Sequence, residues 1–410
     1  MELASLHGRK IAIDASMAIY QFLIAVRAGG PHQQAVMLTN EQGETTSHIQ
    51  GMFNRTIRFM TEGIKPVYCF DGKPPNFKSG ELLKRRQKRE KAQEALRQAT
   101  EEGNVDEENK QSKRLVRAGQ KENDDCKKLL QLMGVPVVLA PCEAEAQAAA
   151  LAKAGKVYAT GTEDMDAVTF ATPILVRKMA FANASKSMVQ TIDYRKAVQG
   201  LGLTHDQFVD LCILLGCDYC DTIRGVGPKT ALKLIREHGN IETILKHVAN
   251  IPKYGIPEGW LPPKKETNEA DDNGSDNEGE DNDKGNKEEK EEQEEEEEFI
   301  PDYVQARKLF HEHEVITDVD LKWKPCQVEE LTKFLVDEQG FNPERVKANI
   351  EKLQAAYKKN QKPQMRMDNF FAVKPTAPKA KATSSGSSAS KRKAEPAGKG
   401  KKKVVKKRWT

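Results

Sequence analysis

Residues 10–14 read KIAID, and residues 66–71 read PVYCFD. Each is a short apolar run rich in β-forming residues, and each ends in an aspartate, Asp14 or Asp71. Runs of this kind that alternate with helical segments predict an α/β domain with a mainly parallel sheet. Functional groups in such sheets collect at the carboxyl ends of the strands, where both aspartates fall. The further short runs and helical segments lie at 123–133, 135–139, 143–154 and 157–160.

The charge of this 410-residue chain is concentrated in separate segments, although its net value is only +4. Residues 266–298 contain 18 acidic and 3 basic residues, which leaves an excess of about +19 on the remainder. Such an excess favours a polyanionic partner. Within the aromatic-poor stretch 78–120, residues 78–97 alone hold 8 basic and 3 acidic residues. We interpret this stretch either as a solvated helical hairpin or as a basic arch over a nucleic-acid channel.

The cysteines and the apolar runs argue against two classes of protein. Only Cys217 and Cys220 form a CxxC pair among the seven cysteines, so a zinc site, which needs a second ligand pair, is not expected. Free thiols buried in a reducing compartment are the expectation instead. No apolar run reaches the roughly 18 residues of a membrane span, and no signal-peptide pattern opens the sequence. We therefore expect a soluble intracellular protein.

Seven acidic residues stand at strand ends or beside apolar residues. A carboxylate in such a place is costly unless it is hydrogen-bonded, solvated or bound to a cation. Two carboxylates about 4 Å apart repel by roughly 1 kcal/mol in water and by about 4 kcal/mol at an effective dielectric of 20. A cluster of them therefore needs metal ions, and ligands that are all oxygens indicate Mg²⁺ or Mn²⁺. The seven are Asp14, Asp71, Glu143, Glu145, Asp164, Asp166 and Asp218.

The spacing within two carboxylate pairs has a geometric meaning. Asp164 and Asp166 are two residues apart after an extended run and can face the same side. Glu143 and Glu145 would diverge by about 200° on a regular helix, so at least one should lie in the first helical turn or in the loop before it. Pro141 just upstream fits a helix start. Each aspartate taken singly is better explained as a helix cap or a turn former, but a convergent set could hold two cations at a scissile phosphate.

A glycine-rich turn lies in the middle of the sequence. Residues 222–231 read TIRGVGPKTA, which places Gly225 and Gly227 before an amphipathic helix that begins at Lys229 and ends at His238. Such a turn presents backbone amides and a helix N-terminus to a phosphate. We interpret it as a sequence-independent grip on a DNA backbone, with an ordinary turn between helices as the alternative.

The C-terminal part from Gln361 is rich in Lys, Ala, Ser and Pro and is expected to be disordered. Its lysine clusters suit nuclear import or electrostatic nucleic-acid contact, or serve only solubility. One apolar island interrupts it, QMRMDNFF at 364–371, in which Met367 falls beside Phe370 and Phe371 on a helical turn. Apolar anchors in a disordered context usually mark a docking peptide, and chance is the alternative.

Taken together, these motifs resemble the eukaryotic flap endonucleases of the XPG-type nuclease superfamily over about residues 8–371. The motifs GRKIAIDAS, KPVYCFDGKPP, KSGEL, EAEA, TEDMD, LGCDYC and GVGPK occur in the order of that family. The resemblance implies an α/β fold with a mainly parallel central sheet flanked by helices, that is, a PIN-like nuclease core. It also implies a helical arch, a helix-two-turn-helix and a disordered C-terminal tail.

The resemblance also implies roles for individual residues, beginning with the seven carboxylates as the metal site. Lys78 and Arg85, seven residues apart and so on one face of a helix, match the family's catalytic basic pair at the base of the arch. Tyr20 matches the aromatic residue that stacks on a base near the cut, and Arg27 is assigned to the DNA contacts. The remaining predicted contacts are Gly225, Gly227 and Lys229 for duplex DNA and Gln364, Met367, Phe370 and Phe371 for the sliding clamp, proliferating cell nuclear antigen.

The activity implied by the resemblance is cleavage of branched DNA that carries a 5′ flap, together with 5′–3′ exonuclease activity. Hydrolysis would use two Mg²⁺ ions, with Mn²⁺ as a substitute. The implied roles are Okazaki fragment maturation and long-patch base excision repair, by a monomer in the nucleus that has no membrane partner. The alternatives are a catalytically impaired DNA-binding clamp adaptor, another 5′ nuclease of the superfamily, and an acidic histone-binding protein.

Two features depart from the family's pattern. The family begins with a Met-Gly-Ile-type start and a longer helical segment than residues 1–7 provide, so we expect part of the N-terminal core to be missing. Residues 266–298 interrupt a matching region, so we expect a disordered surface insertion that lowers DNA affinity or binds basic proteins. The expected organisation is 1–77 and 121–263 for two parts of the nuclease core, 78–120 for the arch, 218–238 for the helix-two-turn-helix, 264–298 for the acidic insertion, 299–358 for the C-terminal helical part of the core, and 359–410 for the tail.

Overall fold

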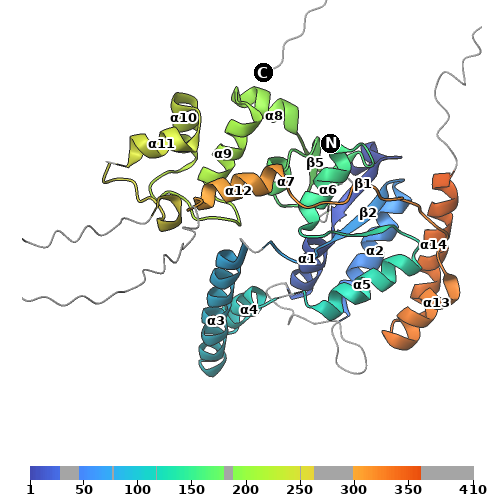
Figure 1. Cartoon of the computed structure of the whole chain (residues 1–410). Coiled ribbons are helices and arrows are strands. Elements are labelled where there is room, and N and C mark those ends of the chain that lie inside the picture. Colours follow the sequence, from blue (N-terminus) through green and yellow to red (C-terminus); the bar gives the residue numbers. More distant parts are fainter. Residues whose placement is uncertain are drawn as a thin grey trace, which may run out of the picture. The chain divides into compact units, whose positions relative to one another are not determined.

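The computed structural model describes residues 1–27, 46–75, 78–116, 118–179, 188–249, 251–262 and 299–361 (Figure 1). The chain divides into two compact units, Met1–Pro363 and Gln364–Thr410, and all of the described residues belong to the first. The acidic run at 266–298 and the clamp peptide at 364–371 lie outside the described residues. What the sequence predicts for these two segments therefore stays a prediction.

A six-stranded sheet lies within the first unit (Figure 1). The strand order is β3-β2-β1-β4-β5-β6, and every neighbouring pair is parallel except β5 and β6. This confirms the predicted α/β fold with a mainly parallel sheet. The sequence patterns indicated the first four strands but not the last two. The bounds are β1 (Lys10–Asp14), β2 (Lys65–Phe70), β3 (Val137–Leu139), β4 (Ala159–Gly161), β5 (Ile174–Arg177) and β6 (Gln190–Asp193).

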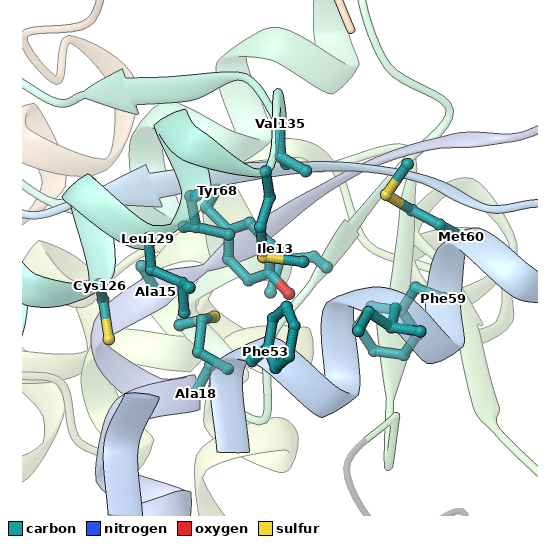
Figure 2. Packing of buried hydrophobic residues seen from close by; sticks show 14 of the residues in the cluster. Ile13, Ala15, Ala18, Phe53, Phe59, Met60, Tyr68, Cys126, Leu129 and Val135 are labelled. Carbon is teal, nitrogen blue, oxygen red and sulfur yellow. The ribbon is translucent and has the colours of Figure 1, made fainter. Parts of the chain in front are cut away.

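Helices cover both faces of the sheet, because successive residues of a strand point to opposite sides. Ile11 and Ile13 of β1 join one buried apolar cluster with residues of α1, α2, α5 and α14. Figure 2 shows Ile13, Phe53 and Tyr68 lying together in that cluster. Ala12 belongs instead to a second cluster, which includes residues of α6. The bounds are α1 (Ala15–Arg27), α2 (Ser47–Thr61), α5 (Gln120–Leu132), α6 (Ala144–Lys153) and α14 (Pro343–Gln361).

Two charged helices, α3 (Ser79–Glu101) and α4 (Val105–Arg114), lie within the stretch 78–120. They pack side by side (Figure 1), and Ala92 and Ala99 of α3 are buried. Most of the other α3 side chains are exposed, as expected for a helix with so many charges. The two interpretations of this stretch are therefore compatible. The helices form a hairpin, while basic residues of α3 line a pocket of about 1150 Å³, which is called the main pocket below.

An ion-pair network ties α12 to α9 and α11. Arg307 on α12 donates from Nε to Asp210 Oδ1 at 2.7 Å and from Nη1 to Glu242 Oε1 at 2.7 Å. Asp210 is 2% exposed, and its Oδ2 also accepts the backbone N–H of Ile241 at 3.1 Å. The network thus holds the start of α11 against its neighbours. The bounds are α9 (His205–Leu215), α10 (Pro228–His238), α11 (Ile241–Val248) and α12 (Asp302–His311).

Replacing Arg307 by alanine is expected to lower the free energy of unfolding by about 3 kcal/mol, because Asp210 then stays buried without a cation. Combining Arg307→Ala with Asp210→Asn should recover part of this loss, since asparagine carries no charge. Urea unfolding of the two variants beside the unmodified chain measures both effects. A double variant less stable than Arg307→Ala would contradict the assignment of the loss to the buried charge.

The remaining elements are short. Met1 donates from its N-terminal ammonium to the carbonyl oxygen of Val189 at 2.9 Å, so the first residues are held at the edge of the sheet. Among the described helices, none is long and apolar enough to cross a membrane. The bounds of these elements are η1 (Leu3–Leu6), α7 (Asp166–Thr169), α8 (Tyr194–Leu201), η3 (Glu258–Trp260), α13 (Val328–Lys333) and the π-helical η4 (Phe334–Glu338).

Candidate active site

Asp14 and Asp71 lie at the carboxyl ends of two neighbouring strands, as predicted. Asp14 is the last residue of β1 and is 5% exposed. Its Oδ1 accepts the backbone N–H of Met17 at 3.0 Å, and its Oδ2 accepts the hydroxyl of Thr162 at 3.2 Å. Asp71 directly follows β2, and its Oδ1 accepts the backbone N–H of Ala144 at 2.8 Å. Each aspartate thus also satisfies a helix N-terminus, so only convergence with the other carboxylates indicates a functional site.

Glu143 and Glu145 lie at the N-terminus of α6. Glu143 is the N-cap residue and Glu145 lies in the first turn, which confirms the prediction from their spacing. Glu143 is buried, and its two oxygens accept hydrogen bonds from the ammonium of Lys78 and the hydroxyl of Tyr219. The partial positive charge of the helix N-terminus also favours carboxylates at this place.

Asp164 and Asp166 lie on a turn after β4. The backbone N–H of Asp164 donates to Thr162 Oγ1 at 3.1 Å, and that of Asp166 donates to Asp164 Oδ1 at 3.0 Å. Asp166 is the first residue of the short helix α7. Asp164 lines the main pocket, whereas Asp166 is not among the lining residues. The charge of Asp164 still acts on Asp166, so the two carboxylates stay near each other although only Asp164 lines the pocket.

Lys78 and Arg85 meet at Asp218. Lys78 Nζ lies 3.0 Å from Asp218 Oδ2, and Arg85 Nη2 lies 2.9 Å and 2.8 Å from the two carboxylate oxygens. Lys78 immediately precedes α3, and Arg85 lies farther along the same helix. The prediction that both project from one face is confirmed, because both contact the same carboxylate.

These side chains surround a pocket of about 1150 Å³. Six of the seven predicted carboxylates line it, all but Asp166. Lys88 and Arg89 of α3 and Arg114 of α4 line the same pocket, as does Tyr20, which is 40% exposed. A cavity with acidic and basic groups side by side suits a phosphate chain that arrives together with cations.

Burial and mutual repulsion raise the pKa of three carboxyl groups. Burial, followed by the charge of Asp71, raises the pKa of Asp14 to about 7. Burial, followed by the charge of Asp164, raises the pKa of Asp166 to about 8. Burial, followed by the charge of Asp14, raises the pKa of Glu145 well above its usual range. The ionised forms of these three carboxyl groups are therefore destabilised in the folded chain. A bound cation would remove this destabilisation.

The basic residues compensate a different part of the cluster. Burial by itself would raise the pKa of Asp218, but the charges of Lys78 and Arg85 outweigh it and lower that pKa. Burial opposes the charged form of Lys78, while the charges of Glu143 and Asp218 raise its pKa above its usual range. Lys78 and Arg85 therefore stay protonated and neutralise the side of the pocket near α3.

The donor set fits a hard divalent cation, because the predicted ligands are all carboxylates. Among the residues described here, no three acidic, histidine or cysteine side chains are already grouped to hold an ion by themselves. The Lys78 ammonium instead lies against Glu143 and Asp218. Because Mg²⁺ keeps several waters and binds through one or two carboxylates, this arrangement suits it without a preformed cage.

The glycine turn before α10 needs a glycine at only one of its two positions. Gly225 has φ of +87°, and a Cβ added there would lie 2.8 Å from the carbonyl oxygen of Lys253. Gly227 has φ of −101°, and a Cβ there would meet nothing within 4 Å. Gly227 is the N-cap of α10, Pro228 follows it in the first turn, and the side chain of Lys229 is exposed.

Gly225→Ala is expected to destabilise the chain by about 1–3 kcal/mol, because both the left-handed backbone and the contact with Lys253 oppose a side chain. Gly227→Ala is the matched control and should cost less than about 1 kcal/mol. Urea unfolding tests stability, and titration of labelled duplex DNA tests binding at the turn. Equal losses in the two variants would contradict the structural distinction between these glycines.

The structure brings two further residues to the site that the sequence analysis did not single out. The hydroxyl of Tyr219 contacts Glu143, and Nε2 of the buried His313 lies 4.0 Å from the same carboxylate. The position of Tyr219 directly after Asp218 was a usable signal. His313 follows α12, far along the chain, so no local pattern could place it.

Five predicted contact residues cannot be located by their side chains. Arg27 is the last residue of α1, but its side chain lies outside the described part of the structure. The clamp residues also lie outside it, and they are Gln364, Met367, Phe370 and Phe371.

Comparison with known proteins identifies the family. The XPG N-terminal domain matches residues 1–92, and the XPG I-region matches residues 134–218. Flap endonuclease 1 of Phaeodactylum tricornutum is 70% identical over 398 residues, which cover 97% of this chain and 92% of that protein. The chain belongs to the flap endonuclease 1 family. Flap endonuclease 1-B of Xenopus laevis is 47% identical over 374 residues, and the match covers 91% of this chain and 85% of that protein.

Solved structures agree with this family assignment. Flap endonuclease-1 from Methanococcus jannaschii is 27% identical, with a TM-score of 0.60, and the match covers 88% of this chain and 96% of that one. The catalytic core of Rad2 in complex with a DNA substrate is 23% identical, with a TM-score of 0.57, and the match covers 86% and 95%. The second likeness concerns the fold alone. The predicted PIN-like nuclease fold is confirmed, and nucleases of this fold depend in general on divalent metal ions.

Proposed function

We propose that this chain is a divalent-metal-dependent endonuclease that cuts branched DNA at the base of a 5′ flap. Membership of the flap endonuclease 1 family supports the substrate and the reaction. The observation that carries the proposal is the pocket in which six carboxylates from separate segments meet Lys78 and Arg85. No side chain needs to act as a nucleophile, since water can attack the phosphate in an in-line displacement.

The carboxylates are the proposed ligands of two Mg²⁺ ions, for which Mn²⁺ can substitute. When bound, the ions supply Lewis-acid activation of water and of the scissile phosphate. Asp14 and Glu145 offer negative charge that the protein does not fully compensate, as the raised pKa of each indicates. The full proposed set is Asp14, Asp71, Glu143, Glu145, Asp164, Asp166 and Asp218.

Lys78 and Arg85 are proposed to hold and neutralise the scissile phosphate. Both are paired with Asp218 in this structure, and Lys78 also contacts Glu143. Where these carboxylates would hold cations, the ammonium of Lys78 and the guanidinium of Arg85 would be available to the phosphate oxygens, on which charge develops. Tyr20 exposes its ring to the same pocket and is proposed to stack on a base beside the cut.

The turn with Gly225, Gly227 and Lys229 is proposed to hold the duplex by its backbone. It offers the exposed N-terminus of α10 and a lysine to a phosphate, and neither feature depends on base sequence. Arg27 is proposed as a further DNA contact on the family resemblance alone.

The function is tested with a labelled double-flap DNA that carries a single 5′ arm. The full chain should release the arm by a cut at the flap junction in Mg²⁺, and EDTA should stop the cut while DNA binding persists. Duplex DNA without a flap is the matched control, and it should be cut much more slowly. Binding without cutting in Mg²⁺ would favour the clamp adaptor, and cutting at internal sites of the unbranched duplex would favour another class of nuclease.

The finer roles are proposed from the same family membership. They are 5′–3′ exonuclease action, Okazaki fragment maturation and long-patch base excision repair, carried out by a monomer in the nucleus. The basic clusters after residue 390 support a nuclear address.

We also propose that residues 364–371 dock on the sliding clamp, proliferating cell nuclear antigen. The apolar anchors Met367, Phe370 and Phe371 and the polar Gln364 support it. Replacing both phenylalanines by alanine should weaken binding to the purified clamp at least about 100-fold, because each buried aromatic anchor contributes about 2 kcal/mol or more. Calorimetry measures the affinity, and the flap-cutting rate without clamp is the control that should not change. Unchanged affinity would place the clamp contact elsewhere.

A further inference from the structure

The CxxC pair flanks Asp218, which lines the main pocket, but neither cysteine has a part in the proposed cleavage. The Sγ atoms of Cys217 and Cys220 lie 3.8 Å apart, within hydrogen-bonding distance for sulfur. Both thiols are free, and both side chains are half-buried. Only Asp218 and Tyr219 separate the two cysteines, so a change in the distance between the sulfurs acts on two residues that contact the site.

Solvent reaches this pair through a second pocket of about 560 Å³. Cys217 and Cys220 both line it, together with Lys84 of α3 and Asp302 of α12. Cys69, by contrast, is 0% exposed in the core. A small water-soluble oxidant can therefore reach the CxxC pair without opening the fold.

We propose that Cys217 and Cys220 form a reversible disulfide that slows cleavage, with a peroxide as the oxidant. One sulfur attacks a peroxide oxygen, the O–O bond breaks, and a sulfenic acid and one water result when the peroxide is hydrogen peroxide. The second sulfur then attacks the first, the S–S bond forms, and the hydroxyl leaves as a second water. The two thiols together lose two electrons and two protons, which the two waters contain.

The disulfide requires a movement of the turn. The sulfurs must approach from 3.8 Å to about 2 Å. Tyr219 is 5% exposed, and its ring lies 5.1 Å from that of Phe310, so it is held in the apolar cluster. The movement therefore falls mainly on Asp218, which carries the contacts of Lys78 and Arg85.

Displacing Asp218 should slow the reaction and not abolish folding. A displacement of about 1 Å in a catalytic arrangement costs up to about 100-fold in rate, so we expect the oxidised chain to cut about 10- to 100-fold more slowly. A disulfide that closes a loop of only two intervening residues near the surface is easily reduced, so a dithiol should restore the rate.

In the test, the full chain is treated with hydrogen peroxide, and catalase then removes the excess peroxide. Only the rate measurement rests on the proposed function. Peptide mass mapping after alkylation should show a linked Cys217–Cys220 peptide that has lost two hydrogen atoms. Flap cutting is compared before oxidation, after oxidation, and after dithiothreitol. Peroxide should not change the cutting rate of Cys217→Ser or of Cys220→Ser, each compared with the same variant before oxidation. Cys142→Ser, which removes a cysteine from the main pocket, should still be slowed by peroxide.

The outcomes separate the two proposals. Absence of the linked peptide at peroxide doses that slow the enzyme would overturn the disulfide. A linked peptide without any change in cutting rate would overturn the regulatory effect of the disulfide. The same would follow if peroxide still slowed Cys217→Ser but no longer slowed Cys142→Ser. Failure of the reduced chain to cut would count against the proposed function, and the linked peptide would still report on the disulfide.

Discussion

Asp14→Asn is expected to abolish flap cutting and, in EDTA, to make the folded chain more stable. The cutting rate should fall at least about 100-fold, because a carboxylate that helps to hold a cation contributes several kcal/mol to the transition state. Asparagine still accepts the N–H of Met17, since its side-chain oxygen is an equally good helix cap. The substitution therefore removes charge while leaving the local hydrogen bond.

The gain in stability follows from the raised pKa of Asp14. Its value in the folded chain is about 7 against an ordinary 3.8, so the folded state binds more protons than the unfolded state between these values. Stability of the metal-free chain therefore falls as pH rises through this range, and the cost is fully present at pH 8. Since one pKa unit corresponds to about 1.4 kcal/mol and the group is coupled to Asp71, we expect a gain of about 1–3 kcal/mol.

Urea unfolding at pH 8, with EDTA or with Mg²⁺, measures this effect. Mg²⁺ should stabilise the unmodified chain more than it stabilises the Asp14→Asn chain. The difference in unfolding free energy between the two chains should therefore be smaller in Mg²⁺ than in EDTA, or reversed. Asp124→Asn is the control, because Asp124 is an exposed aspartate on α5 that pairs with Lys127. It should leave cutting unchanged. If the Asp14→Asn chain were less stable in EDTA than the unmodified chain, the ionised Asp14 would not destabilise the fold and the prediction would be wrong.

Lys78→Ala should lower the rate constant for cutting about 100- to 1000-fold, with little change in the affinity for the flap substrate. The reason is that one preorganised charge aimed at the reacting group typically contributes this much, whereas many other contacts hold the DNA. Single-turnover kinetics at saturating enzyme measures the rate constant, and titration in EDTA measures the affinity.

The ion pairs of Lys78 also lead to a prediction about the variant that lacks both Lys78 and Arg85. Both residues contact Asp218, so their effects should not be independent. The Lys78→Ala/Arg85→Ala double variant should lose less rate than the product of the two single losses. A conservative Lys78→Arg change should recover part of the rate.

Lys352→Ala provides the control for a lysine outside the site, since Lys352 lies exposed on α14. It should cut at the rate of the unmodified chain. If Lys78→Ala weakened DNA binding about as much as it slowed cutting, Lys78 would be a binding residue and the proposed role at the scissile phosphate would be wrong.

Much of the fold was predictable because it depends on local patterns. The apolar run before Asp14 and the run before Asp71 each indicated a strand, and parallel strands present their carboxyl ends at one edge. The spacing of Glu143 and Glu145 placed them at a helix start. The strands β5 and β6 were not predicted, since each has only four residues and half or more of their side chains are only partly buried.

The candidate site was only partly predictable for a related reason. Asp166 begins the short helix α7 and does not line the pocket, whereas Asp164 two residues before it does. His313 reaches Glu143 from a segment that follows α12. Neither result follows from residue type or from hydrophobic period, because both depend on how the backbone turns.

The sequence by itself determined the class of the sheet, the family, and the set of carboxylates and basic residues, since these depend on residue types and on short spacings. The tertiary structure decided that Lys78 neutralises Glu143 and Asp218 while Asp14 stays uncompensated. It also decided that the CxxC pair opens to solvent beside Asp218. Charge compensation and access are set by distances between segments that lie far apart along the chain, and only folding brings those segments together.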